Sequence, residues 1–177
     1  MQKIELKFVL RVAAVLLCIS TLVAVLIASV HLLTKDKIAE HEAEAVRQAI
    51  GELFPGLDSV ACEGDFPAEV SACYRILQDT ETVGYCVYVA SPGYGGDISM
   101  MVGVNADGTV HGVTIVSASE TAGIGSKALE ASHLTKFNGK RDAASVDGIS
   151  GASISSRGVQ NGVRIALELV QGGKIHA

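Results

Sequence analysis

The chain has 177 residues, enough for one compact domain beside a membrane segment. Hydrophobic residues make up 49% but aromatic residues only 5%, and Trp is absent; with a mean hydropathy of +0.37, this aliphatic excess indicates a membrane segment. The first 11 residues hold three of the 14 basic and one of the 19 acidic residues, so the remainder carries a net charge of −7. An acidic chain without a basic stripe is not expected to bind nucleic acid, and five scattered histidines predict no metal site.

The first predicted element is a membrane-spanning helix over residues 12–34. This apolar stretch lies between Arg11 and Lys35, with His31 as its only basic residue. It exceeds the roughly 20 residues that cross a bilayer, and no small-residue cleavage motif follows it. Three Lys or Arg residues precede it and two follow closely, so we expect residues 1–11 in the cytoplasm and the main domain outside.

A connecting helix is predicted next, over residues 35–55. Val46, Ile50 and Leu53 fall on one stripe of this segment, with acidic residues opposite. Pro55 ends the helix because proline disfavours helical geometry in the residue before it. We therefore expect the extracytoplasmic domain to occupy residues 56–177.

Four strands are predicted in this domain, over residues 73–77, 84–90, 98–104 and 110–116. Turn signals at residues 91–93 and 105–108 separate consecutive strands and favour an antiparallel sheet. A final helix over residues 153–170 has Val159, Val163 and Ala166 at helical spacing and should pack on this sheet. The predicted fold class is α+β, with one N-terminal transmembrane helix followed by an antiparallel sheet packed by helices.

Three cysteines lie beyond the membrane helix. Cys62, Cys73 and Cys86 are an odd number without CxxC spacing, which disfavours zinc and iron–sulfur sites. Cys62 and Cys73 either form a disulfide, in an oxidising compartment, or remain thiols in a reducing one.

Two glycine-rich stretches interrupt the predicted sheet, at residues 93–96 and 120–125. Each is either an ordinary turn or a place where the backbone approaches a ligand closely. Directly before the last helix lies a serine cluster, for which two interpretations also stand. Ser150 or Ser153 caps the helix through its hydroxyl, or the helix N-terminus receives a phosphate that a hydroxyl there could bear covalently.

The segment Asp147-Gly148-Ile149-Ser150-Gly151-Ala152-Ser153 resembles the covalent flavin attachment motif Asp-x-x-[Ser/Thr]-Gly-Ala-[Thr/Ser]. Together with residues 93–98, 102–108 and 120–125 in the same order, it resembles the FMN-binding domain family. The resemblance covers most of the chain, which is similar to the G subunit of the Rnf ion-translocating electron transport complex. The C subunit of the sodium-pumping NADH:quinone reductase shares the domain but is generally longer.

The resemblance implies one covalent FMN per chain, which a flavin transferase attaches to the Ser153 hydroxyl as a phosphoester. It places Ser150, Gly151 and Ala152 around the phosphate. The loop that it places along the flavin comprises Thr121, Gly123, Ile124 and Gly125. Glu120 would orient this loop or disfavour a negatively charged reduced flavin, and Asp147 would serve transferase recognition or cap its own loop. No catalytic residue or metal ligand of the chain itself is expected, because the cofactor performs the chemistry.

Two residues depart from the family pattern. Ser153 stands where the family usually has threonine, which keeps the hydroxyl but adds side-chain freedom. Ala122 stands where the family usually has proline, which leaves the loop more flexible before binding.

By the same resemblance, the chain is an electron-relay subunit in the cell (inner) membrane, as a non-autonomous part of an oxidoreductase. The complex would couple electron transfer between ferredoxin and NAD to sodium or proton translocation, with its other membrane and peripheral subunits as partners. One alternative is the FMN-carrying subunit of a sodium-pumping NADH:quinone reductase or of another extracytoplasmic electron-transfer system. Another is a membrane-anchored binding domain without a redox cofactor.

Overall fold

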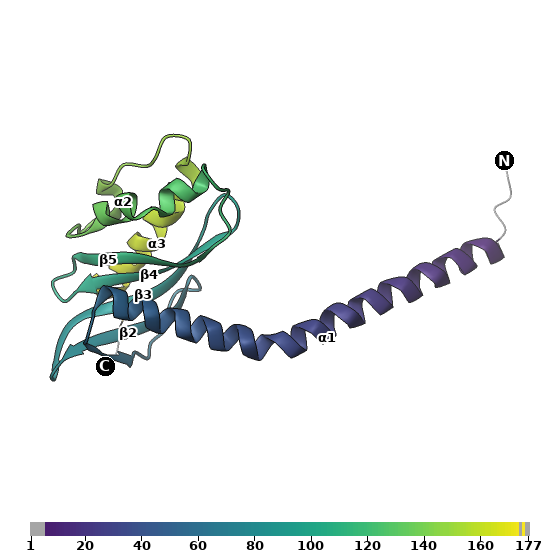
Figure 1. The fold of residues 1–177 in the computed structure, drawn as a ribbon, viewed down its shortest axis with the longest axis horizontal. Helices are drawn as coiled ribbons and strands as arrows, with labels where there is room; N and C mark the ends of the chain where they lie inside the picture. The colour runs from purple at the N-terminus through teal and green to yellow at the C-terminus, as the bar shows by residue number, and fades with distance from the viewer. Residues whose placement is uncertain (1–5, 174, 176–177) are drawn as a thin grey trace. The chain divides into compact units, whose positions relative to one another are not determined.

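The computed structural model describes residues 6–173 and 175 (Figure 1). The chain divides into two compact units, Met1–Glu44 and Ala45–Ala177. The first contains most of a long helix, and the second contains the end of that helix, a five-stranded sheet and the remaining helices. The fold class is thus the α+β arrangement that the sequence predicts.

Helix α1 runs without interruption over Leu6–Leu53. Its segment Val9–Lys35 is long and apolar enough to cross a membrane, and its side chains are exposed. The hydroxyls of Thr21, Ser29 and Thr34 donate to carbonyls four residues earlier, at 2.7–2.9 Å. These hydroxyls are satisfied within the helix, as a lipid environment requires. Lys3 and Glu5, on which the predicted orientation partly depends, lie outside the described residues.

The last turns of α1 belong to the core of the second unit. Val46, Ile50 and Leu53, the predicted stripe, are buried with Phe54 against the sheet residues Ile76, Cys86, Tyr88 and Met101. The helix ends at Leu53, two residues before the predicted end at residue 55, and Phe54-Pro55 follow it. The His111 ring stacks on Phe54 with centroids 4.2 Å apart, and its Nε2 lies 2.9 Å from the Leu53 carbonyl oxygen. The sheet thereby binds the C-terminal end of the helix directly.

All neighbouring strands pair antiparallel, and their spatial order follows the sequence. The strands are β1 (Asp58–Ala61), β2 (Val70–Gln78), β3 (Glu81–Pro92), β4 (Asp97–Asn105) and β5 (Val110–Ala118). The four longer strands are the predicted ones, each extended by a few residues. Strand β1 was not predicted, because its four residues are all exposed and show no alternation.

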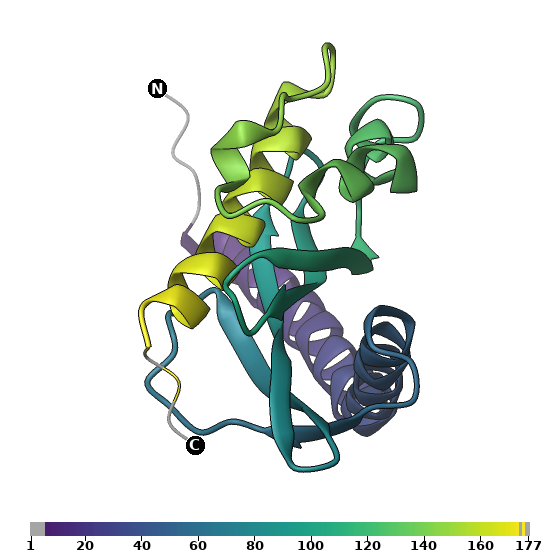
Figure 2. The same ribbon diagram turned by 90° about the vertical axis from the view of Figure 1, so that its left-hand side faces the viewer.

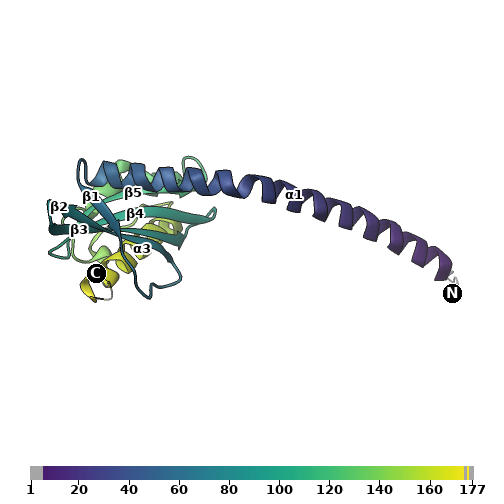
Figure 3. The same cartoon turned by 90° about the horizontal axis from the view of Figure 1, so that it is seen from below.

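The sheet is covered on both faces, with α3 (Ser153–Gln171) on one and the end of α1 on the other (Figure 3). This double coverage explains the continuous apolar run in β4. Met100 packs in the core beneath α3, and Met101 packs beneath α1. Strands that are buried on both faces lose the apolar–polar alternation of a half-exposed strand.

Helix α3 packs on β3 and β4 through Val159, Val163 and Ala166, which are fully buried as predicted. Four short helices precede it in the chain; two of them pack against α3, and the other two pack against the last strand, β5 (Figure 2). They are η1 (Gly125–Leu129), α2 (Ala131–Leu134), η2 (Thr135–Phe137) and η3 (Ala143–Ser145). No element was predicted between β5 and α3, because helices of three to five residues show no periodicity in the sequence. Their buried side chains fix the loop that leads into α3.

Candidate functional site

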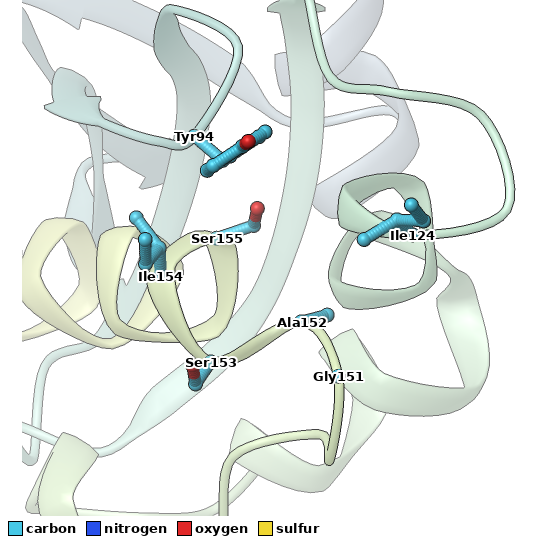
Figure 4. Close-up of a pocket in the computed structure, with 7 residues that line it drawn as sticks. All are labelled: Tyr94, Ile124, Gly151, Ala152, Ser153, Ile154 and Ser155. Atoms are coloured by element: carbon cyan, nitrogen blue, oxygen red, sulfur yellow. The ribbon is translucent and has the colours of Figure 1, made fainter.

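A cavity of about 250 Å³ opens at the N-terminal end of α3. Three segments that are distant in the sequence form its wall (Figure 4). Tyr94 comes from the β3–β4 hairpin, Ile124 comes from the loop after β5, and residues 151–155 come from the start of α3. The topology of the sheet brings these three segments to one edge of the domain.

Ser153 is the first residue of α3, and it is exposed. The N-cap residue is Ala152, and no side chain caps this helix. The alternative in which Ser150 or Ser153 caps α3 is therefore wrong. In Figure 4 the Ser153 hydroxyl points away from the Tyr94 ring. The amides of Ser153 to Ser155 lie in the first turn, where a helix provides no intrahelical acceptors.

The turn before α3 is held by a serine that the sequence analysis did not assign. Ser156 Oγ accepts a hydrogen bond from the amide of Ile149 at 3.0 Å, and Ser156 itself is fully buried. The Ala152 amide donates to the Ile149 carbonyl at 3.0 Å, and Gly151 adopts a φ of +83°. A glycine is needed at such a left-handed position because other residues are strained there. The motif glycine thus turns the chain into the helix.

Glu120 connects the three segments of the cavity wall. Its Oε1 accepts hydrogen bonds from the amides of Tyr94 at 2.8 Å and Gly95 at 3.4 Å, and its Oε2 accepts one from Ser155 Oγ at 2.8 Å. We call these three bonds the Glu120 bridge. Charge-assisted hydrogen bonds of this kind are stronger than neutral ones. The predicted loop-orienting role of Glu120 fits this geometry.

Two glycines leave room for the Glu120 carboxylate. A Cβ on Gly93 would lie 2.0 Å from Glu120 Oε1, and a Cβ on Gly125 would lie 1.9 Å from Oε2. Both distances are far inside van der Waals contact, so any other residue at either position would displace the carboxylate. The stretch at 93–96 is an ordinary hairpin turn, closed by the Gly93 amide bonding the Gly96 carbonyl at 2.8 Å, and it also supplies part of the cavity wall.

The loop at 120–125 makes a tight turn after β5. The Thr121 carbonyl accepts from the amides of Ile124 and Ser126, and the Gly123 amide donates to Ser126 Oγ at 2.9 Å. Only Ile124 of this loop lines the cavity, whereas Gly125 is buried behind it.

Four of the predicted site residues meet at the cavity, namely Gly151, Ala152, Ser153 and Ile124. Glu120 and Gly125 lie behind its wall. Four other predicted residues do not line it, namely Thr121, Gly123, Asp147 and Ser150, and all four are exposed.

Three further residues line the cavity that were not predicted from the sequence, namely Tyr94, Ile154 and Ser155. Tyr94, Ile124 and Ile154 are 65%, 53% and 45% exposed, so three large apolar side chains face solvent around one cavity. Such exposure marks a binding surface more often than a structural one. For Tyr94 a signal existed in the sequence, since it is an aromatic residue among glycines in a chain with few aromatics.

Comparison with protein families gives two matches. Residues 93–168 match the sequence model of the FMN-binding domain, and residues 1–53 match that of the RnfG N-terminal region. The first match contains the β3–β4 hairpin, the loop after β5 and most of α3, and so all the segments that form the cavity.

Several curated proteins are similar over much of their length. The G subunit of the Na⁺-translocating ferredoxin:NAD⁺ oxidoreductase complex of Acetobacterium woodii is 26% identical over 96% of this chain and 95% of its own. The G subunit of the proton-translocating ferredoxin:NAD⁺ oxidoreductase complex of Clostridium ljungdahlii is 35% identical over 57% and 62%. The G subunit of the ion-translocating oxidoreductase complex of Vibrio atlanticus is 27% identical over 90% and 87%.

Among solved structures, NqrC of Shewanella oneidensis superposes with a TM-score of 0.49 and 21% identity, over 60% of this chain and 64% of that one.

The two family matches cover different parts of the structure. The RnfG N-terminal match reaches to the end of the long helix, and the FMN-binding domain match covers the segments that form the cavity. The chain therefore belongs to the family of FMN-binding domain proteins that includes the G subunits of Rnf-type oxidoreductase complexes.

Proposed function

We propose that this chain carries a single FMN on Ser153 and relays electrons as the G-type component of a membrane complex that acts on ferredoxin and NAD⁺. The FMN-binding domain match and the names of the relatives support this function. The observation that carries the attachment site is the exposed Ser153 hydroxyl at the first position of α3, beside the cavity.

The four serines at the start of α3 differ in availability. Ser155 and Ser156 are buried, and their hydroxyls are engaged by Glu120 and by the Ile149 amide. Ser150 and Ser153 are exposed, but only Ser153 lines the cavity. Ser153, the residue that the attachment motif designates, is therefore also the one of these four serines that is both exposed and in the cavity wall, which supports it as the attachment site.

The residues around Ser153 fit a flavin nucleotide. The first-turn amides of α3 and the positive end of its dipole would bind the phosphate. Tyr94, Ile124 and Ile154 present exposed apolar surface of the kind that a flavin ring covers. When bound, FMN supplies the electron-transfer chemistry, while the chain's residues fix its position.

Attachment would be a phosphoryl transfer by a separate flavin transferase. The Ser153 oxygen forms a bond to the phosphorus of the FMN half of FAD, the pyrophosphate bond breaks, AMP leaves, and the serine loses its proton. Asp147 is exposed on the loop before Ser153, where a transferase has access to it. We assign Asp147 to recognition by that enzyme and Ser150 to the surroundings of the phosphate.

Glu120 would act from behind the cavity wall. Its carboxylate fixes Ser155 and the hairpin amide of Tyr94, so it determines how far apart the two sides of the cavity stand. Its negative charge would also disfavour added negative charge on a flavin in the cavity.

The membrane arrangement follows from α1. We propose that its apolar segment crosses the inner membrane once, with the N-terminus in the cytoplasm and the FMN domain outside it. The relatives include both a sodium-translocating and a proton-translocating complex, so the proposal covers coupling to either ion. With one candidate span among the described residues, ion translocation is assigned to the other subunits.

The test is intact-mass analysis of the full chain, produced with and without a flavin transferase. With the enzyme, the wild-type chain should gain the mass of one FMN less one water, and its flavin fluorescence should survive denaturation. Ser153→Ala should gain nothing, Ser153→Thr should be labelled, and Ser150→Ala should still be labelled.

Labelling of Ser153→Ala would refute Ser153 as the site. If denaturation releases the flavin, the flavin is bound non-covalently and the proposed covalent attachment is wrong. A wild-type chain that binds no flavin in the presence of the transferase would favour a membrane-anchored binding domain without a redox cofactor.

A further inference from the structure

Two cysteines lie opposite each other at the edge of the sheet. The β1–β2 register pairs Ala61 with Tyr74, and one step further the Cys62 amide donates to the Cys73 carbonyl at 2.8 Å. Residues directly opposite each other in an antiparallel pair point to the same face of the sheet. Cys73 lies in the core beneath α3, and Cys62 packs against that same core.

We propose that Cys62 and Cys73 are a disulfide-forming pair that links the end of edge strand β1 to the interior of the sheet. The pairing rests on strand register and on a shared core, and it is independent of the flavin site. Cys86 is not an alternative partner. It lies on β3 opposite Tyr74 and packs in the other core, beneath α1.

The two thiols differ in accessibility, which sets the order of the chemistry. Cys73 is 1% exposed, whereas Cys62 is half-buried. A disulfide-containing oxidant therefore reacts first at Cys62, whose sulfur forms a mixed disulfide and releases one thiol of the oxidant. Cys73 then attacks the Cys62 sulfur, loses its proton and releases the second thiol. In total, two cysteine thiols are oxidised and one external disulfide is reduced.

Once formed, this disulfide should resist reduction. A reductant reaches only the Cys62 sulfur, so Cys73 must be the leaving group. Burial, reinforced by the neighbouring Cys62, raises the pKa of Cys73 well above the ordinary value for a thiol. A thiol with a high pKa leaves slowly, so the bond behaves as a structural link.

The link would hold the weakest edge of the sheet. Strand β1 has four residues, all exposed, and it pairs only with β2. The segment after Cys62 places Phe66 against the core beneath α3. Closing the loop between Cys62 and Cys73 prevents β1 and this segment from separating from the sheet, and it restricts the unfolded chain.

The test uses the full chain in detergent, first reduced and then incubated with oxidised glutathione. Free thiols are blocked with N-ethylmaleimide, and the chain is digested without reductant for mass spectrometry. We expect a peptide pair linked through Cys62 and Cys73, two hydrogens lighter than the reduced peptides, and a rise in Tm of roughly 5–10 °C. Cys86→Ala is the matched control, in which the same link must form.

Cys73→Ala should stop at a mixed disulfide of Cys62 with glutathione. If that variant does not fold, Cys62→Ser is used instead, because its position is only half-buried. In folded Cys62→Ser, the buried Cys73 should gain no glutathione. The proposal is overturned by a wild-type chain that keeps glutathione on Cys62, by one in which both thiols are alkylated after incubation, or by a link that contains Cys86. Each outcome is read without flavin, so it is separate from the test of Ser153.

Discussion

The Ser155 hydroxyl donates a hydrogen bond of 2.8 Å to Glu120 Oε2, and this bond ties the first turn of α3 to the loop after β5. The other oxygen of the same carboxylate binds the amide of Tyr94 on the β3–β4 hairpin. One side chain thus sets the spacing between the apolar residue Tyr94 and the helix start that bears Ser153.

Removing the Glu120 bridge should loosen the cavity. Glu120→Ala leaves the buried Ser155 hydroxyl and two amides without their acceptor, at a cost of about 2–3 kcal/mol in the free energy of unfolding. Glu120→Gln keeps one oxygen for the amides and should cost about 1 kcal/mol. Urea unfolding in detergent measures both values. Glu130→Ala, at an exposed glutamate of the same region, is the control and should change little; equal losses for Glu120→Ala and Glu130→Ala would contradict the role of the bridge.

Gly125→Ala and Gly93→Ala should disrupt the same bridge by a steric route. The added methyl would stand about where a Glu120 oxygen now lies, and overpacking of this kind costs about 1–3 kcal/mol. Gly51→Ala should change the free energy of unfolding in the opposite direction. Gly51 lies in α1 with nothing within 4 Å of the added carbon, so alanine should stabilise the helix by about 0.5–1 kcal/mol. Thermal unfolding separates these outcomes; an unchanged Tm for Gly125→Ala would show that the carboxylate is free to move.

Acid should destabilise the domain through His133. This side chain is buried, and both ring nitrogens lack a hydrogen-bond partner among the described residues. Burial, followed by the nearby charge of Lys136, lowers the pKa of His133 below its ordinary value of 6.5. The unfolded chain therefore binds the proton at a higher pH than the folded chain. This contribution to stability is complete above about pH 6.5 and is lost as the pH falls from there through the lower folded-state pKa.

Replacing His133 with leucine should remove that part of the pH dependence. His133→Leu eliminates the proton uptake and the unpartnered nitrogens, so it should also raise stability at pH 7.5 by about 1 kcal/mol. Unfolding in urea at pH 7.5, 6.5 and 5.5 compares the slopes. His41→Gln, at an exposed histidine of α1, should keep the wild-type slope. The same slope in wild type and His133→Leu would exclude this histidine as the source.

The contact between His111 and the end of α1 predicts a local effect. His111→Ala removes the bond to the Leu53 carbonyl and the stack on Phe54, which should cost about 1–3 kcal/mol. His111→Phe keeps a ring over Phe54 and should recover part of the loss. Hydrogen exchange at the Phe54 amide, which bonds the Ile50 carbonyl at 2.8 Å, reports the change directly. Exchange there should accelerate in His111→Ala but not in Asn138→Ala, at an exposed residue that lines the same surface pocket as His111.

The sequence was sufficient to predict those elements whose patterns extend over many residues. The long strands and α3 carry apolar residues at regular spacing, and the structure buries Val159, Val163 and Ala166 as that spacing requires. Strand β1 and the short helices between β5 and α3 lie where no pattern exists. Their positions come from tertiary packing, such as the complete burial of Ala128 and Phe137.

The candidate site, too, could be predicted from the sequence only in part. The segment that ends at Ser153 is contiguous, so its resemblance to an attachment motif was visible in the sequence. Tyr94 and Ile154 line the same cavity from positions 60 residues apart. What brings their segments together is the Glu120 bridge, whose partners lie 26 and 35 residues away from Glu120 in the chain. Hydrogen bonds over such separations are set by the fold and leave no local pattern.

The continuity of α1 affects how the second unit of this protein should be produced. Its last turns cover one face of the sheet with Val46, Ile50 and Leu53. A shortened polypeptide that starts at Gly56 would leave Ile76, Tyr88 and Met101 facing water, at a cost of several kcal/mol at roughly 1.5–3 kcal/mol for each large apolar side chain. Starting near Ala45 retains that cover and removes the exposed apolar segment Val9–Lys35, so this is the cut that should yield a monodisperse, well-expressed domain.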